Sequence, residues 1–228
     1  MIFAAGFGTR MGALTSDRPK PLVVVAGRPL IDHALGVARA AGFLRIVANL
    51  HYKGEQLAAH LAGSGVALSW ERTRILETGG GLRAALPLLG PGPVATLNPD
   101  VAWTGANPLT ELLTGWDPAH MNALVLLLPA DKATGHDGPA DFTLAPDGRI
   151  ARAAGGPGYR YLGAQILRTE GLAAIKDEAF SLNQIWDAEI AAGRAYGLVH
   201  QGGWCDVGRP EGIALAEALL AKGSADAR

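Results

Sequence analysis

Long apolar runs, paired cysteines and an excess of one charge are all missing from this chain of 228 residues. The strongest candidate for a membrane span, Ala123–Pro129, is far shorter than the roughly 18 to 20 residues that cross a bilayer. Met1 is not followed by the basic flank and apolar core of a secretory signal. The single cysteine, Cys205, has no partner for an internal disulfide, which agrees with a reducing cytoplasm. We therefore expect a cytoplasmic protein without a membrane partner.

The charge balance and the histidine spacing exclude further classes. A net charge of −1 provides no basic face of the kind that binds nucleic acid, so no nucleic-acid partner is expected. Hydrophobic content of 49% with 18% charged residues is typical of a compact globule, and the length suits one domain. No fixed-period repeat is present, which excludes repeat folds. Six histidines lack metal-ligand spacing and are expected on the surface or in the core: His33, His51, His60, His120, His136 and His200.

The order of strand-like and helix-like segments predicts an α/β domain. Over residues 1–120 the two kinds alternate, which is the pattern of a mostly parallel sheet covered by helices. The second half carries more consecutive strand-like segments, with an Asp147-Gly148 hairpin turn, and is expected to be more antiparallel. Expected strands are 2–4, 44–50, 66–71, 94–97, 123–128, 142–144, 149–151, 161–167 and 195–200. Expected helices are 30–41, 54–61, 82–89, 109–113, 170–175, 182–192 and 210–221.

The chain opens on a phosphate-binding pattern. The short apolar strand Ile2–Ala4 runs into a loop with three glycines, and Arg10 and Lys20 follow. Glycine has no Cβ, so successive backbone N–H groups can turn toward a polyphosphate while the two cations supply charge. Because the first strand is unusually short, we expect the native chain to begin a few residues earlier. The pattern predicts a nucleotide site.

Three phosphate loops compete for this stretch. A P-loop needs lysine and serine or threonine directly after the glycines, and that arrangement is absent here. A dinucleotide loop would place its third glycine one position earlier than Gly12 and would want an acid after the second strand, which ends in Asn49-Leu50-His51. An NAD-dependent oxidoreductase is therefore a weak alternative.

The third possibility rests on five motifs in order. They are Ala4–Met11 with Pro19–Leu22, Glu77–Gly81, Asn98-Pro99-Asp100, Tyr161-Leu162-Gly163 and Trp204–Gly208. Together they resemble the sugar-1-phosphate nucleotidyltransferases, and within that family the uridylyltransferases of N-acetylmuramate 1-phosphate, with mannose-1-phosphate guanylyltransferase-like enzymes as near relatives. The resemblance implies a single Rossmann-like three-layer α/β/α domain with a mostly parallel mixed sheet, over residues 1–222. A nucleotide-binding part would take residues 1–120, a sugar-phosphate part residues 121–209, and a tail residues 223–228.

The implied reaction is attack by a sugar 1-phosphate on the α-phosphorus of a nucleoside triphosphate, with release of pyrophosphate. The resemblance implies UTP as the nucleotide substrate, with GTP as the alternative. It implies N-acetylmuramic acid 1-phosphate as the sugar substrate, with mannose or heptose phosphates as alternatives. The implied role is in peptidoglycan recycling or surface-polysaccharide synthesis. The barrier to such a reaction is the meeting of two polyanions, so cations carry the catalysis. Mg²⁺ prefers hard oxygen ligands, and the resemblance assigns it to Asp100 and Asp206.

The remaining roles also follow from the resemblance. Arg10 and Lys20 are the catalytic cations, although either could be an ordinary charged residue. Asp100 and Asp206 have an alternative reading as turn or helix caps. Residues implied at the nucleotide are Ala4, Ala5, Gly6, Gly8, Thr9, Arg10, Glu77, Gly79, Gly80 and Asn98. Residues implied at the sugar phosphate are Asp141, Gly163 and Asn183, each of which has an ordinary structural explanation.

Departures from the family pattern set limits on these roles. Proline at position 99 replaces the commoner glycine and removes a backbone N–H, and Arg209 stands where many relatives have threonine. The Glu-Lys-Pro segment of many hexose-1-phosphate enzymes is replaced by Ala153–Gly158. The chain ends without the hexapeptide repeats of bifunctional relatives, so we expect no acetyltransferase activity. We expect a monomer or a weak homodimer. A nucleotide-sugar-binding module without turnover remains the alternative from another class.

Overall fold

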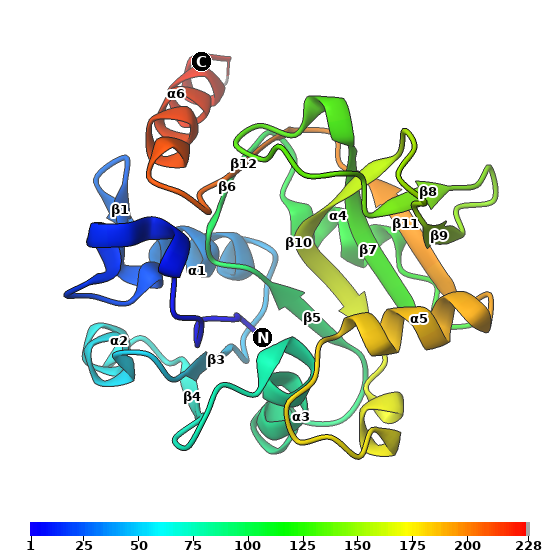
Figure 1. The fold of residues 1–228 in the computed structure, drawn as a ribbon, viewed down its shortest axis with the longest axis horizontal. Helices are drawn as coiled ribbons and strands as arrows, with labels where there is room; N and C mark the ends of the chain where they lie inside the picture. The colour runs from blue at the N-terminus through cyan, green and yellow to red at the C-terminus, as the bar shows by residue number, and fades with distance from the viewer. Residues whose placement is uncertain (227–228) are drawn as a thin grey trace.

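The computed structural model describes residues 1–226, and the N-terminus lies in the middle of its central sheet (Figure 1). Ile2 forms parallel bridges to Ala48 on one side and to Leu97 on the other, so the expected first strand is present as a bridge at one residue. The strands across this sheet are, in order, β4 (Ala67–Trp70), β3 (Val47–Leu50), β5 (Val94–Leu97), β10 (Tyr159–Leu167), β7 (Ala123–Pro129) and β11 (Ala195–Val199). The bridges of Ile2 join the parallel pair of β4 and β3 to the other four strands. Among those four, β10 runs antiparallel to both β5 and β7, while β11 runs parallel to β7.

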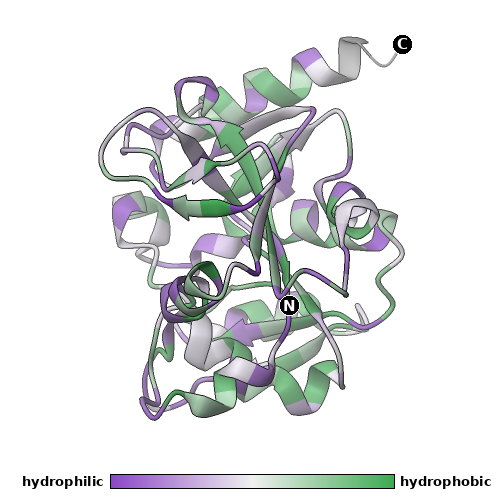
Figure 2. Ribbon diagram, turned by 90° about the vertical axis from the view of Figure 1, so that its right-hand side faces the viewer, coloured by the Kyte–Doolittle hydropathy of each residue, from purple (hydrophilic) through white to green (hydrophobic). Residues whose placement is uncertain are grey.

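Alternate residues of β7 enter two different cores. Leu124 and Leu126 pack in one cluster, and Val125 and Leu127 pack in the other, because successive side chains of a strand point to opposite faces. The first core contains side chains of α1 (Leu30–Ala40), α2 (Gly54–Leu61) and α4 (Pro108–Gly115). The second contains side chains of α3 (Glu77–Leu89) and α5 (Asn183–Ala191). Two helical layers therefore cover one sheet, and the predicted three-layer α/β fold with a mixed sheet is confirmed. The central strands are mainly apolar in Figure 2.

Local sequence signals explain the position of several helices and strands. In α1 the buried side chains follow helical spacing, at Leu30, Ile31, Ala34, Leu35 and Ala38. At α4 the Asn107 side chain caps the helix by accepting hydrogen bonds from the backbone N–H groups of Leu109 and Thr110. The bounds of α2 and β5 match the sequence expectations at both ends.

Two strands that the sequence analysis did not anticipate pair with each other. β6 (Val101–Thr104) and β12 (Gly203–Asp206) run antiparallel, with Asp206 opposite Val101 and Trp204 opposite Trp103. A third apolar cluster beneath them includes Met11 and Cys205. The other elements not yet given are β1 (Val24–Val25), β2 (Arg28–Pro29), β8 (Phe142–Leu144), β9 (Ile150–Arg152) and α6 (Glu211–Asp226), with 3₁₀ turns at Thr9–Thr15, Lys20–Leu22, Ala130–Lys132 and Glu170–Ala174.

Several expected bounds were wrong. The helix expected over 82–89 begins at Glu77, so the three glycines lie inside it rather than before it. The helix expected over 170–175 is a 3₁₀ turn over Glu170–Ala174. The last helix, expected over 210–221, is α6 and continues to Asp226, into the residues 223–228 that were expected as a tail. Residues 227–228 of that expected tail lie outside the described part of the chain. No helix within residues 1–226 is both long and apolar enough to cross a membrane.

Candidate active site

Two pockets of about 220 Å³ each meet at Asn98 and Asp100. The Glu77 pocket is lined by Phe3, Ala5, Gly6, Asn49, Ile75, Glu77, Thr78, Asn98 and Asp100. The Asp206 pocket is lined by Arg10, Asn98, Asp100, Val101, His136, Asp141, Arg160, Tyr161, Leu162, Gly163, Trp204 and Asp206. Because the two share a wall, ligands in the two pockets would lie side by side.

Strand pairing brings the two predicted metal-binding carboxylates to the same pocket. Asp206 lies opposite Val101 in the β6–β12 ladder, so it is next to Asp100, and the backbone N–H of Val207 donates to the Asp100 carbonyl over 2.9 Å. Two residues that are 106 positions apart in the sequence therefore line the Asp206 pocket together. The Trp204 indole donates to the Leu162 carbonyl over 2.9 Å, which ties the same strand to β10.

Lys20 lies against this pair of carboxylates. Its Nζ donates to Asp100 Oδ2 over 2.5 Å, and its side chain is 11% exposed. Gly8 makes this position possible, since a Cβ on Gly8 would lie 2.8 Å from the Lys20 Cβ and the Gly8 φ of 65° is left-handed. The glycine loop therefore packs directly on Lys20 and holds it at the junction of the two pockets.

Arg10 comes from the same loop and lines the Asp206 pocket. A Cβ placed on Gly208 would lie 2.7 Å from Asp206 Oδ2 and 3.2 Å from Arg10 Nη1, so the glycine leaves room for both charged groups. Gly208 closes the Trp-Cys-Asp-Val-Gly motif, and this crowding explains why a residue without a side chain stands there. The opening loop and the last motif thus meet at one pocket.

A second glycine, Gly163, shapes the wall between the pockets. Its φ of 84° and the register shift in β10 between Tyr161 and Gln165 mark a bulge, and Asn98 N–H donates to the Gly163 carbonyl over 2.8 Å. A Cβ at position 163 would lie within 3.0 Å of the Asn98 side chain. Gly163 therefore lets Asn98 lie between the two pockets.

The wall of the Glu77 pocket is held by a buried chain of hydrogen bonds. Asn49 accepts from Ala4 N–H over 2.7 Å and donates to Glu71 Oε1 over 2.6 Å. Glu71, which is 2% exposed, accepts from Leu76 N–H over 2.7 Å. Because every donor and acceptor in this chain has a partner, it fixes the first strand relative to the segment that leads into Glu77.

Glu77 itself has a left-handed φ of 59°, which is uncommon for a residue with a Cβ. The side chain is exposed at the pocket rim. The glycines after it have a packing role: the N–H groups of Gly79 and Gly80 both donate to the Phe180 carbonyl, over 2.8 and 3.1 Å. A Cβ on Gly79 would collide with the Phe180 ring. These two N–H groups are therefore already paired within the protein.

Three basic groups pair with the three carboxylates of the Asp206 pocket. Besides Lys20 on Asp100, Arg160 Nη1 donates to both oxygens of Asp141 over 3.1 and 3.0 Å. Tyr161 N–H adds a bond of 2.9 Å to Asp141 Oδ2. His136 Nδ1 lies 3.2 Å from Asp206 Oδ2. Sequence analysis missed Arg160 and His136, and His136 was expected only as a surface or core residue. His136 has no motif around it, and Arg160 directly precedes the Tyr161-Leu162-Gly163 motif without being part of it.

The titration of two neighbours limits their chemistry. Burial raises the pKa of Tyr161, so its phenol is neutral at physiological pH and is unsuited to act as a base. Burial, with a smaller contribution from the Asp206 charge, raises the pKa of the Cys205 thiol to about 11. Cys205 is therefore a small buried residue beside the site, and its thiol is unsuited to act as a thiolate nucleophile.

The structure gathers some of the predicted site residues and not others. Lining one or both pockets are Ala5, Gly6, Arg10, Glu77, Asn98, Asp100, Asp141, Gly163 and Asp206. Lys20 contacts Asp100, and Ala4 N–H contacts Asn49 at the edge of the Glu77 pocket. Asn183 lies at the start of α5 and accepts a hydrogen bond from Arg152 over 2.9 Å. The predicted site residues outside the linings of both pockets are Ala4, Gly8, Thr9, Lys20, Gly79, Gly80 and Asn183.

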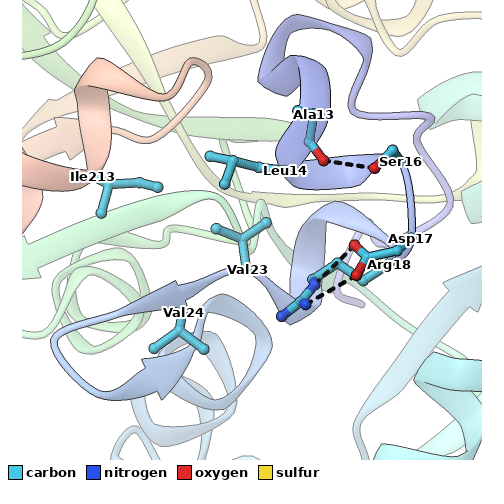
Figure 3. A pocket seen from close by; sticks show the side chains of 8 residues that line it. All are labelled: Ala13, Leu14, Ser16, Asp17, Arg18, Val23, Val24 and Ile213. Atoms are coloured by element: carbon cyan, nitrogen blue, oxygen red, sulfur yellow. Dashed lines mark hydrogen bonds and ion pairs between the residues drawn. The ribbon is translucent and has the colours of Figure 1, made fainter.

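A larger hollow of about 440 Å³ lies elsewhere, between the loop after Met11, β1 and α6. Figure 3 shows Leu14, Val24 and Ile213 around it, together with Asp17 and Arg18. The two charged residues pair with each other over 3.1 Å. Since its charges pair with each other, this hollow is poorly suited to a polyphosphate.

Comparisons with known proteins agree with this geometry. The family profile of the MobA-like NTP transferase domain matches residues 1–139. The N-acetylmuramate alpha-1-phosphate uridylyltransferase of Caulobacter vibrioides is 39% identical, over 97% of this chain and 96% of its own length. That of Neisseria meningitidis serogroup B is 36% identical, over 96% of each. Among solved structures, HddC from Yersinia pseudotuberculosis complexed with GMP-PN superposes with a TM-score of 0.76 at 20% identity, over 95% of this chain and 96% of its own.

Proposed function

The chain belongs to the sugar-1-phosphate nucleotidyltransferases with a MobA-like NTP transferase domain, and from that premise we propose that it transfers UMP from UTP to N-acetylmuramic acid 1-phosphate. The products are UDP-N-acetylmuramic acid and pyrophosphate. The choice of both substrates rests on the two full-length relatives that carry this activity in their names. Under this proposal the enzyme works in the cytoplasm, in the recycling of peptidoglycan sugars.

One observation carries the proposal: Lys20, Asp100 and Asp206, from three distant segments, meet where two adjoining pockets share a wall. Nucleotidyl transfer needs this arrangement, because two phosphorylated substrates must be aligned end to end at one cationic centre. We assign the Glu77 pocket to the nucleotide and the Asp206 pocket to the sugar 1-phosphate.

The nucleophile is already an anion, so the chain's own work is to position and to neutralise charge rather than to move protons. Lys20, at the junction, would donate to the attacked α-phosphate. Arg10, from the same glycine loop, lines the Asp206 pocket, and it would bind the phosphates that leave as pyrophosphate if the triphosphate extends past Asp100 from the Glu77 pocket. The neutral phenol of Tyr161 would serve as wall rather than as acid or base.

The donor set at the junction suits Mg²⁺. Among residues 1–226 no three His, Cys, Asp or Glu side chains cluster as a protein-only metal site, and Asp100 and Asp206 form an oxygen-donor pair. Mg²⁺ is commonly held by one or two carboxylates, with phosphate oxygens and water completing six positions. Asp100 and Asp206 would hold it, and when bound it neutralises the charge that develops on the phosphates.

Recognition differs between the pockets under this assignment. Backbone of Ala5 and Gly6, with Glu77 and Asn98, would surround the nucleoside. Asp141 would accept from sugar hydroxyl groups, because Arg160 and Tyr161 N–H hold it in place. Roles for Ala4, Gly8, Thr9, Gly79, Gly80 and Asn183 in substrate binding remain predictions, and the contacts of Gly8, Gly79 and Gly80 give each a packing function as well.

The test crosses nucleoside triphosphates with sugar 1-phosphates and measures Mg²⁺-dependent release of pyrophosphate. We expect the highest kcat/KM with UTP and N-acetylmuramic acid 1-phosphate. GTP with mannose or heptose 1-phosphates serves as the alternative arm. Absence of pyrophosphate with the UTP and N-acetylmuramate pair would refute the assignment, and nucleotide-sugar binding without turnover of any pair would indicate a non-catalytic module.

A further inference from the structure

His136 is the basic group of the Asp206 pocket that is least tied to its carboxylate. Its one hydrogen bond, Nδ1 to Asp206 Oδ2, is 3.2 Å long, and its side chain is 28% exposed. By contrast, Lys20 pairs with Asp100 over 2.5 Å, and Arg160 makes two bonds to Asp141 with a side chain that is 9% exposed. Of the three pairs, the one at Asp206 is the easiest to separate.

The loop that carries His136 is anchored on both sides of it. Before His136, Asp206 N–H donates to the Thr134 carbonyl over 3.0 Å. After it, Arg160 Nη2 donates to the Pro139 carbonyl, and Gly138 lies so close that a Cβ there would be 2.7 Å from His136 Nε2. The backbone around His136 is therefore held at the pocket, while the imidazole can exchange one hydrogen-bond partner for another.

A carboxylate next to the imidazole makes Nδ1 the donor, because both oxygens of Asp206 are acceptors. Resting on the proposed function, Asp206 turns its oxygens to a divalent cation when the site is loaded. With its negative charge shared with the cation, Asp206 holds the Nδ1–H of His136 more weakly, and this part-exposed donor is then able to turn to another anion in the pocket. The nearest new anion in that site is the sugar phosphate.

We propose that His136 is a substrate-binding residue that exchanges Asp206 for the phosphate of the sugar 1-phosphate when the site is loaded. It recognises the phosphate rather than the sugar, so its contribution is the same for every sugar 1-phosphate that the pocket admits. Lys20 and His136 then act alike, each paired with a metal-binding aspartate in the unloaded site and facing phosphate in the loaded one.

The test uses His136→Leu, which removes the donor, and His136→Asn, whose amide N–H stands where Nδ1–H was. His60→Asn is the matched control, because His60 pairs with Asp32 over 2.8 Å on the surface, away from both pockets. Calorimetry with Mg²⁺ and a non-hydrolysable UTP analogue gives the affinity for N-acetylmuramic acid 1-phosphate and for N-acetylglucosamine 1-phosphate, which lacks the lactyl carboxylate. Mn²⁺ binding without substrates, followed by electron paramagnetic resonance, gives the affinity for metal.

We expect His136→Leu to weaken binding of both sugar 1-phosphates about tenfold, the size of one charge-assisted hydrogen bond. The affinity of His136→Asn for both sugar 1-phosphates should stay within about threefold of wild type. Neither variant should bind the UTP analogue or Mn²⁺ more weakly than wild type. Unchanged sugar-phosphate binding in His136→Leu, a loss confined to the lactyl-bearing sugar, or weaker Mn²⁺ binding would each overturn the proposal. If wild type binds no sugar 1-phosphate, the proposed function fails with it; if only the variant comparison fails, the proposed function stands.

Discussion

The two pockets that meet at Asp100 are built by different means. The Glu77 pocket is walled by backbone, glycine and a fully satisfied Ala4–Asn49–Glu71–Leu76 chain of hydrogen bonds. The Asp206 pocket is walled by three carboxylates, each with one basic partner. The first wall has no basic side chain in its lining and is fixed by hydrogen bonds to backbone, and the second carries ion pairs that can be exchanged. The difference indicates that shape selects the ligand on the first side and charge on the second.

Replacing Lys20, which lies at the junction, should damage both sides at once and have the largest effect. We expect Lys20→Ala to lower kcat by roughly 10²- to 10³-fold, since a preorganised cation at the attacked phosphate is lost. Circular dichroism should show an intact fold. Lys176→Ala, at an exposed lysine, is the control and should keep wild-type turnover. Near-normal turnover of Lys20→Ala would remove Lys20 from the mechanism.

Replacing Asp141 should affect only the charged side. Asp141→Asn weakens the bidentate contact with Arg160 and the acceptor offered to the sugar, so we expect the KM for the sugar 1-phosphate to rise about tenfold. The KM for UTP should change little, which steady-state kinetics with each substrate varied in turn can measure. Asp147→Asn, at an exposed hairpin turn, provides the matched control. An equal rise in both KM values would erase the contrast between the pockets.

Replacing Asn49 should give the reverse pattern. Asn49→Ala removes the hydrogen-bond partner of Ala4 N–H and of Glu71 Oε1, and we expect a loss of about 1 to 3 kcal/mol in the free energy of unfolding. The KM for UTP should rise while that for the sugar 1-phosphate changes less. Urea denaturation measures the first effect and kinetics the second. A sugar-side defect in this variant would contradict the division of roles.

Treating the folded protein with a thiol reagent should not change its activity, although Cys205 adjoins Asp206. Burial raises the pKa of this thiol to about 11, so almost none is thiolate at pH 8. We expect iodoacetamide to leave Cys205 unlabelled in the folded protein, with full activity, and to label it in guanidinium chloride. Mass spectrometry follows the label. Rapid labelling of the folded protein with loss of turnover would show that this part of the site opens to solvent.

The parts of the fold that follow periodic apolar patterns could be predicted from the sequence. The bounds of α2 and β5 were predicted at both ends because buried positions recur there at regular spacing. β6 and β12 were missed because neither Val-Ala-Trp-Thr nor Gly-Trp-Cys-Asp shows the alternation of apolar and polar residues that indicates a strand. Their pairing, which no local pattern encodes, is what brings Asp100 and Asp206 together.

The candidate site likewise has residues that the sequence predicted and residues that only the structure revealed. Motif residues such as Gly163 and Gly208 were found, and the structure adds the reason for them, since each leaves room for a side chain of the site. His136 lies in a segment without a motif, and Arg160 stands just before the Tyr161-Leu162-Gly163 motif; their contacts with Asp206 and Asp141 are tertiary and no local pattern indicates them. The helix at Glu77 begins earlier than expected because two of its three glycines, which are poor helix formers, are held by hydrogen bonds from Gly79 and Gly80 N–H to the Phe180 carbonyl.

The most direct test of the central claim, that the two pockets form one nucleotidyl-transfer site, is to follow the label of UTP carrying ³²P at the α-phosphate. The protein is incubated with this UTP, N-acetylmuramic acid 1-phosphate and Mg²⁺, and the products are separated by chromatography. We predict that label and sugar leave together in UDP-N-acetylmuramic acid, with an equal amount of unlabelled pyrophosphate. Label that stays in UTP, or that appears in UMP or UDP without the sugar, would contradict the account.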